Sequence, residues 1–194
     1  MKPKNLIFEG WRDKKLFETA ITRVPSGFEN VKQLKTVGRC FAHGVKQMKC
    51  ITPLFEAGNR KCLILSDADT VARQTQSEYQ RDKGFGLWQR YDEIINGATE
   101  ITGEDFLKET TFKSSLENLK NDFNIPGPLP SLAVPSGKVL AIRQWLLRNG
   151  QSAEAVNKAV ESVKERVFND LKVSEINAGY YDYLLGVWSV IDQM

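Results

Sequence analysis

Two short runs of consecutive apolar residues constrain the fold of this chain most. Residues 6–8 (LIF) and 62–65 (CLIL) are unbroken, and each is followed at once by acidic residues and then by a helical pattern. Continuous apolar runs of this length are typical of strands buried on both faces, which occur in parallel sheets covered by helices. The sequence therefore predicts an α/β fold with a mostly parallel sheet.

The segments between these runs supply the remaining elements of such a sheet. Apolar residues recur at helical spacing from Leu16 to Val24, and Pro25 ends the pattern. Residues 41–56 and 70–82 also predict helices, and residues 31–37 predict a second strand that stops at Gly38. Strands and helices thus alternate, which indicates a Rossmann-like sheet with helices on its faces.

The character of the chain changes near residue 125. Residues 125–130 (IPGPLP) cannot continue a helix and predict a rigid connector. Helical faces follow over 139–146 and 156–171, and residues 176–191 are apolar and aromatic enough for a core helix, a partner-binding face being the alternative. We therefore expect an α/β catalytic domain over 1–124 and a C-terminal helical extension over 125–194.

The composition excludes several kinds of site. The 194 residues carry a formal net charge of +3, with one histidine and three cysteines that form no zinc-binding pattern. An odd number of cysteines favours reduced thiols. The first ten residues hold too short an apolar stretch for a secretion signal or a membrane span, so we expect a cytoplasmic protein. Chemistry in this chain must then come mainly from carboxylates, lysines or tyrosines.

Acidic residues follow both apolar runs. Glu9 and Asp13 come after the first run, and Asp67 and Asp69 come directly after the second. Because the carboxyl ends of parallel strands meet at one edge of a sheet, these four side chains are expected to converge there. Buried carboxylates repel one another unless a cation or shared protons compensate. Oxygen ligands without imidazole or thiolate favour Mg²⁺, Mn²⁺ or Ca²⁺ over Zn²⁺.

The combined pattern resembles the Toprim domain, which topoisomerases, bacterial primases and OLD-family nucleases share. That family has a strand ending in Glu-Gly, often with an acid three residues later, and a second strand ending in Asp-x-Asp. The resemblance covers about residues 5–82, with Gly38 in the place of a glycine that usually follows the intervening strand. Primases commonly have a small residue soon after Asp-x-Asp, whereas residues 70–73 here are TVAR, and no topoisomerase-type tyrosine can be assigned. Of the enzymes that share this domain, the nucleases are therefore the group that the sequence resembles.

The resemblance implies a nuclease that depends on Mg²⁺ or Mn²⁺ and hydrolyses phosphodiester bonds in DNA or RNA. Glu9 would act as general acid or base or as a metal ligand, and the aspartates Asp13, Asp67 and Asp69 would bind metal. Residues 100–107 (EITGEDFL) resemble a later acidic stretch of the family. This resemblance implies that Glu104 or Asp105 lies near the metals, as in a two-metal mechanism. OLD-like nucleases often work beside an ATPase in phage defence, which implies a partner ATPase.

Two other functions fit the same residues. One is a catalytically silent Toprim-like module that binds nucleic acid or a partner protein. The other is a metal-dependent phosphatase or phosphotransferase, which normally has an aspartate nucleophile where this chain has Glu9. A two-metal site requires Glu9 and Asp67 to lie within about 10 Å of each other, because its ions are roughly 4 Å apart.

Each acid also has a purely structural interpretation. Glu9 and Asp13 can cap the first helix, Asp67 and Asp69 can form a turn, and Glu104 can complement a helix dipole. Basic side chains near the strand ends either face substrate phosphates or form a solvated surface. These are Arg12, Lys14, Lys15, Lys46, Lys49, Arg60 and Lys61.

Overall fold

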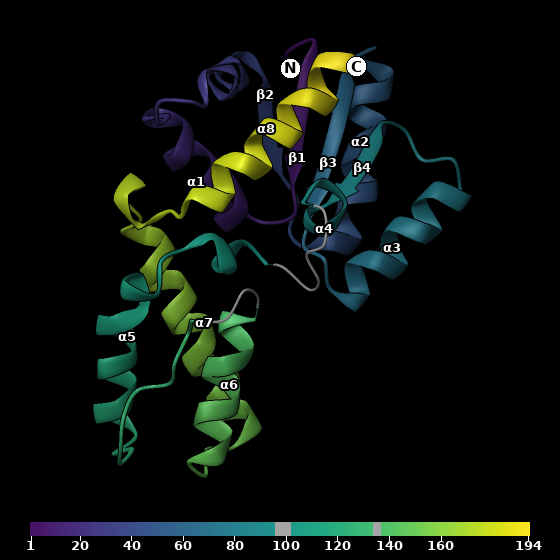
Figure 1. Cartoon of the computed structure of the whole chain (residues 1–194). Coiled ribbons are helices and arrows are strands. Elements are labelled where there is room, and N and C mark those ends of the chain that lie inside the picture. Colours follow the sequence, from purple (N-terminus) through teal and green to yellow (C-terminus); the bar gives the residue numbers. More distant parts are fainter. Residues whose placement is uncertain (96–101, 134–136) are drawn as a thin grey trace.

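A parallel sheet with helices on both faces forms one part of the molecule, and a group of helices lies beside it (Figure 1). This computed structural model describes residues 1–95, 102–133 and 137–194. Within those ranges the sheet has four strands in the order β2-β1-β3-β4, and every neighbouring pair is parallel. The strands are β1 (Lys4–Phe8), β2 (Gly38–Phe41), β3 (Lys61–Ser66) and β4 (Leu87–Arg90). The predicted α/β class with a parallel sheet is therefore confirmed.

Helices connect the strands and make up most of the rest of the described chain. The α-helices are α1 (Trp11–Thr22), α2 (Met48–Ala57), α3 (Thr70–Arg81), α4 (Tyr91–Ile94), α5 (Glu109–Asp122), α6 (Lys138–Arg148), α7 (Ala153–Asn169) and α8 (Ala178–Gln193). Short 3₁₀ helices are η1 (Glu29–Thr36), η2 (Val45–Gln47), η3 (Gly103–Phe106) and η4 (Val173–Glu175). The helices expected around 16–24, 70–82 and in the C-terminal extension are all present.

The two covered faces of the sheet explain the apolar runs within its central strands, residues 6–8 of β1 and 62–65 of β3. Successive strand residues point to opposite faces. Leu6 and Phe8 pack with α1 and α8 on one face, whereas Ile7 packs with residues of α2 and α3 on the other. All three are at most 2% exposed. Because helices cover both faces, residues 6–8 include no position at which a side chain reaches solvent, and all three are apolar.

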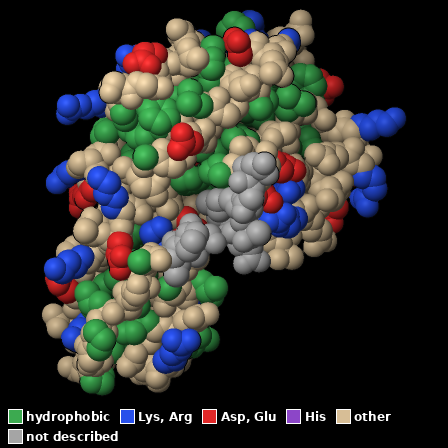
Figure 2. Space-filling view, in the orientation of Figure 1, with side chains coloured by type: hydrophobic (Ala, Val, Ile, Leu, Met, Phe, Trp, Pro, Cys, Tyr) green, Lys and Arg blue, Asp and Glu red, His purple; other side chains and the backbone are tan. Residues whose placement is uncertain are grey.

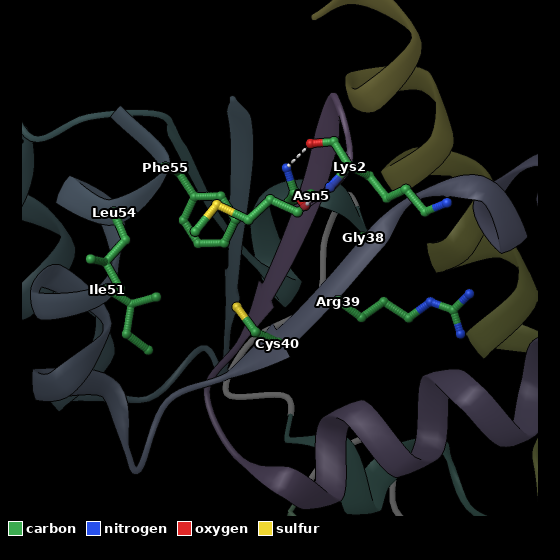
Figure 3. Close-up of a pocket in the computed structure, with 9 residues that line it drawn as sticks. Lys2, Asn5, Gly38, Arg39, Cys40, Ile51, Leu54 and Phe55 are labelled. Atoms are coloured by element: carbon green, nitrogen blue, oxygen red, sulfur yellow. Dashed lines mark hydrogen bonds between the residues drawn. The ribbon is translucent and has the colours of Figure 1, made fainter. Parts of the chain in front are cut away.

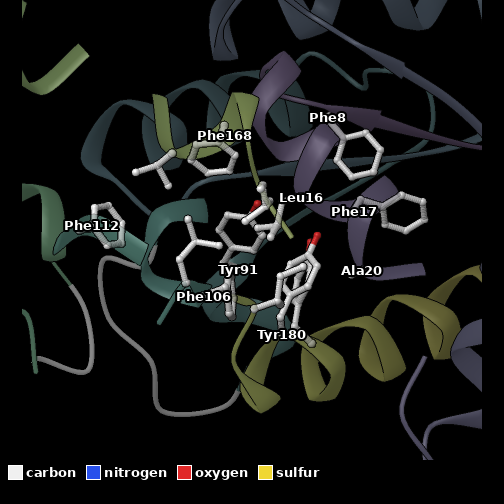
Figure 4. Close-up of a cluster of buried hydrophobic side chains, with 14 of the residues drawn as sticks. Phe8, Leu16, Phe17, Ala20, Tyr91, Phe106, Phe112, Phe168 and Tyr180 are labelled. Carbon is white, nitrogen blue, oxygen red and sulfur yellow. The ribbon is translucent and has the colours of Figure 1, made fainter. Parts of the chain in front are cut away.

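The larger of the two cores continues from the sheet into the helical part. It runs from Phe8 and Phe17 through Phe106 of η3 to Phe112 of α5 and Phe168 of α7 (Figure 4). The C-terminal aromatic residues belong to it, since Tyr180, Tyr181 and Tyr183 are at most 3% exposed. Their predicted role as core residues is confirmed. Helix α8 then crosses back over the sheet in Figure 1.

One predicted strand is wrong. Residues 31–37 lie mostly in the 3₁₀ helix η1, because Val31 and Leu34 are three residues apart and point to the same side of such a helix, where both are fully buried. The strand β2 begins at Gly38 instead of ending there. Its residues are only partly buried because β2 is an edge strand, so it lacks the apolar run of β1 and β3.

Other boundaries also differ from the sequence pattern. The helix expected over 41–56 begins later, since Phe41 ends β2 and the helical turns start at Val45. Strand β4 was not predicted, because it is an edge strand in which Trp88 alone is fully buried. No helix within the described ranges is long and apolar enough to cross a lipid bilayer.

Gly38 provides a test of the sheet edge at β2. A methyl group there would collide with the Oδ1 atom of Asn5, a buried side chain that donates to the backbone oxygens of Lys2 and Lys61. We expect Gly38→Ala to lower the free energy of unfolding by about 1–3 kcal/mol, measured by urea denaturation. The control is Gly179→Ala in α8, where the added carbon meets its nearest atom at 3.4 Å. An equal effect of both substitutions would contradict this account.

Candidate active site

The acidic residues predicted at the strand ends converge where the strand order reverses. β2 lies on one side of β1 and β3 on the other, which makes the carboxyl ends of β1 and β3 the position where ligands bind in open α/β sheets. Glu9 directly follows β1, and Asp67 directly follows β3. The backbone N–H of Asp67 donates to Oε2 of Glu9 at 3.3 Å. The two residues therefore meet the distance that a metal site requires.

Asp13 joins this pair from the first turn of α1. Its Oδ2 atom accepts a hydrogen bond from the backbone N–H of Gly10 at 3.1 Å, and its Oδ1 atom accepts one from the Tyr91 hydroxyl at 3.1 Å. A Cβ atom on Gly103 would lie 2.8 Å from Oδ1 of Asp13, so only glycine lets η3 approach this carboxylate. Asp13 thus caps α1, as its structural interpretation predicts, and also lies beside the other acids.

Asp69 is the most peripheral of the predicted acids. Its side chain is exposed, and its Oδ1 atom accepts a hydrogen bond from the backbone N–H of Ala72 at 2.7 Å. This contact makes it the N-cap of α3. Its negative charge still contributes to raising the pKa of Glu9, so it lies within electrostatic range of the site.

Glu104 and Asp105 have separate roles. Oε1 of Glu104 is 2.8 Å from Nζ of Lys164 on α7, and this pair is largely shielded from solvent. Asp105 accepts hydrogen bonds from the backbone N–H groups of Lys138, at 2.9 Å, and Thr102, at 3.1 Å. Asp105 therefore joins η3 to the start of α6, whereas Glu104 is the residue of this stretch that interacts with the other acids.

Burial and mutual repulsion disfavour ionisation of three of these acids. Burial, reinforced by the charge of Asp13, raises the pKa of Glu9 to about 7. Burial and the charge of Glu104 raise the pKa of Asp13 to about 6, and burial with the charges of Asp13, Glu104 and Glu9 raises the pKa of Asp67 well above its ordinary value. Such a cluster near neutral pH either retains protons or binds a cation.

Glu104 differs from the other three because a lysine accompanies it. Burial opposes its ionisation, but the charge of Lys164 and the hydrogen bond from it lower the pKa of Glu104 below the ordinary value. The same pair keeps Lys164 protonated, since the charge of Glu104 outweighs burial and raises the lysine pKa. Lys164 also lowers the pKa of Asp13 and of Asp67, although other effects dominate there.

Asp67 carries the clearest sign of a missing interaction. Its Oδ1 atom is buried and has no hydrogen-bond partner. A buried, unpaired carboxylate oxygen is costly, and a hard cation such as Mg²⁺ would satisfy it. The donor chemistry of Glu9, Asp13 and Asp67 therefore fits a divalent ion. In the described part of the chain, however, no three Asp, Glu, His or Cys side chains are grouped closely enough to hold a metal as they stand, so coordination requires side-chain rotation.

The predicted basic residues are only partly available to a substrate. Arg12 pairs with Glu161 at 3.0 Å, and Lys14 pairs with Glu18 at 3.3 Å. Lys46 and Lys49 line a cavity of about 360 Å³ between α2 and α3. Lys46 lies on η2, which follows β2, and Lys49 lies at the start of α2. The other wall of the cavity is α3, which follows β3. Both lysines therefore lie toward the carboxyl edge of the sheet, where the acids also lie.

A larger cavity lies at the opposite edge of the sheet. It has a volume of about 500 Å³ and lies near the start of β1 and β2, where Asn5, Gly38 and Cys40 face Phe55 of α2 (Figure 3). The side-chain nitrogen of Asn5 donates to Lys2 and Lys61, so this cavity leaves that group satisfied. It takes no part in the acidic cluster.

Two contributors to the site were not predicted. Tyr91 directly follows β4, and the sequence pattern did not show that strand. Lys164 lies 60 residues after Glu104 on an amphipathic helix, where charged residues on the polar face are ordinary. Nothing in the sequence distinguishes Lys164 from other lysines on the polar face of such a helix. Tyr91 could have been identified as the residue that follows β4, had that strand been predicted.

Comparison of the chain with protein-family models, curated proteins and solved structures finds no match in any of the three. The resemblance to the Toprim domain therefore rests on the motif residues themselves.

The raised carboxyl pKa values predict how stability depends on pH. Between about pH 4 and pH 7 the folded chain holds protons on Glu9 and Asp13 that the unfolded chain has lost. The free energy of unfolding of the metal-free protein should therefore fall as pH rises through this window, by about 1 kcal/mol or more per pH unit. Urea denaturation with a chelator at a series of pH values measures it.

A matched pair of variants assigns this effect to the site. Glu9→Gln removes one of the titrating groups and should flatten the pH dependence. Glu154→Gln changes an exposed glutamate of α7 and should leave it unchanged. Stability that rises with pH across the window would contradict the assignment.

Proposed function

We propose that this protein is a divalent-metal-dependent nuclease of the Toprim type, which hydrolyses phosphodiester bonds in DNA or RNA. The observation that carries the proposal is the convergence of Glu9, Asp13 and Asp67 at the carboxyl ends of β1 and β3, with a buried, unpaired oxygen on Asp67. Burial alone would make this arrangement unfavourable, and a divalent cation would compensate for it.

The residues divide the chemistry among them. A bound Mg²⁺ or Mn²⁺ would supply Lewis-acid stabilisation of a phosphate. Asp13 and Asp67 would hold the ion, with Asp69 at the periphery and Glu104 beside Lys164. Glu9, which directly follows β1 beside Asp67, would act as a general acid or base or as a further ligand of the ion. Tyr91 orients Asp13 through its hydroxyl.

The net charge of +3 is too small to indicate nucleic-acid binding by itself, and on the face shown in Figure 2 the Lys and Arg side chains are scattered. The position of particular lysines therefore matters more than the total. Lys46 and Lys49 would contact phosphates beside the acidic edge.

The proposal includes a partner ATPase in phage defence and a cytoplasmic location. Three free cysteines support a reducing compartment.

Metal-dependent cleavage tests the proposal. The purified chain is incubated with plasmid DNA, single-stranded DNA and RNA, with Mn²⁺ or with a chelator. We expect cleavage only with Mn²⁺, and a loss of at least about 100-fold in Asp67→Asn and Glu9→Gln, because each substitution removes a charge that the reaction needs. Asp82→Asn, at an exposed residue after α3, is the matched control and should keep full activity.

The outcomes separate the alternative functions. Cleavage that survives both site substitutions would refute the assignment of these acids. Binding of nucleic acid or a partner without any cleavage would favour the silent module. Release of phosphate from a small phosphomonoester, without cleavage of nucleic acid, would favour the phosphatase.

Binding of nucleic acid provides a separate prediction. Replacing Lys46 and Lys49 by Gln should weaken binding of single-stranded DNA and reduce the slope of log K against log salt by about 1–2, since about 0.7 counterions are released per phosphate contact. Fluorescence anisotropy at several salt concentrations measures both quantities. Replacing Lys158, which lies on α7 and pairs with Glu154, is the control. An unchanged slope would place the substrate elsewhere.

A further inference from the structure

A lysine from the C-terminal part reaches the acidic cluster of the sheet. Nζ of Lys164 lies 2.8 Å from Oε1 of Glu104, and the side chains are 22% and 5% exposed. Glu104 in turn follows Gly103, whose backbone approaches the carboxylate of Asp13 closely enough to exclude a side chain. The ammonium group therefore lies at the edge of the site formed by Glu9, Asp13 and Asp67.

A second ion pair fixes the helix that carries this lysine. Arg12 of α1 pairs with Glu161 of α7 at 3.0 Å, and Glu161 also lies 3.9 Å from Lys164. Arg12 is only three residues beyond Glu9, so α7 is tied to the start of α1, next to the end of β1. Lys164 therefore pairs closely with Glu104, and Glu161 lies beside it at a longer distance.

Charge balance determines how many further cations this site accepts. Glu9, Asp13, Asp67 and Glu104 carry four negative charges when all are ionised. Two divalent ions would balance them, but Lys164 already supplies one positive charge and occupies Glu104. A second divalent ion at Glu104 would have to displace the ammonium group or lie beside it, and like charges at contact distance repel strongly when partly buried.

We propose that Lys164 takes the place of a second divalent cation, so that the site binds a single ion through the carboxylates at the ends of β1 and β3 while Glu104 stays with the lysine. This inference rests on the proposed metal-dependent function and departs from the two-metal site that the Toprim resemblance implies. The Oδ1 atom of Asp67 is buried and without a hydrogen-bond partner, so it is free to bind that ion while Lys164 pairs with Glu104.

The number of Mn²⁺ ions bound per chain tests the inference without any activity measurement. Isothermal titration calorimetry gives the stoichiometry, and electron paramagnetic resonance distinguishes an isolated Mn²⁺ ion from a coupled pair. The unchanged protein should bind one ion with an uncoupled spectrum. Lys164→Gln removes the charge but keeps a hydrogen-bond donor for Glu104, and it should bind two ions with a coupled spectrum.

Two further variants separate charge from structure. Lys164→Arg keeps the positive charge and should still bind one ion. Lys158→Gln removes an exposed charge from the same helix and should also bind one. Glu104→Gln should leave the single ion in the otherwise unchanged protein, but it should remove the second ion from Lys164→Gln.

Each remaining outcome counts against a defined claim. Two ions in the unchanged protein, or one ion in a folded Lys164→Gln variant, would overturn the role of Lys164 while leaving the metal site intact. Circular dichroism shows whether Lys164→Gln folds. If it does not fold, loss of the single ion in Glu104→Gln would overturn the proposed role of Lys164. No Mn²⁺ binding by any variant would refute the proposed metal-dependent function itself.

Discussion

The parallel pairing of β1 with β3 is the interaction on which the rest of the structure depends. The register places Phe8 opposite Leu65, so the residues after each strand emerge side by side. Burying both strands on two faces requires their apolar runs, and ending both runs at the same edge places Glu9 beside Asp67. The acids are close together because the hydrophobic pairing is strong enough to outweigh their repulsion.

The surrounding elements then moderate that repulsion from several directions. Backbone N–H groups of Gly10 and Asp67 and the hydroxyl of Tyr91 stabilise the carboxylates, and Lys164 provides a full positive charge. These contacts come from the residue before α1, the residue after β3, α4 and α7, which are distant in the sequence. The site is therefore a property of the assembled fold, and the Oδ1 atom of Asp67 is the buried carboxylate oxygen there that none of these contacts satisfies.

Local patterns were enough to predict the central strands and most helices, because burial on two faces or on one helical face leaves a direct record in the sequence. They also predicted Glu9, Asp13 and Asp67 as neighbours. Edge strands leave a weaker record, so residues 31–37 were assigned to a strand that lies over 38–41, and β4 was missed with Tyr91. Lys164 could not be predicted as a site residue. Its contact with Glu104 depends on how α7 packs against the rest of the chain, which no local sequence pattern records.

The position of α8 determines when one face of the sheet becomes covered during folding. This last described helix covers one face of the sheet, where Val187 and Ile191 are fully buried, and the Lys4 side chain of β1 donates to the backbone oxygen of Ile191 at 2.7 Å. The strand β1 is thus covered by a helix that lies far from it in the sequence. Until α8 packs, this face of the sheet exposes apolar surface, and the contact forms late in folding because closing so long a loop is costly.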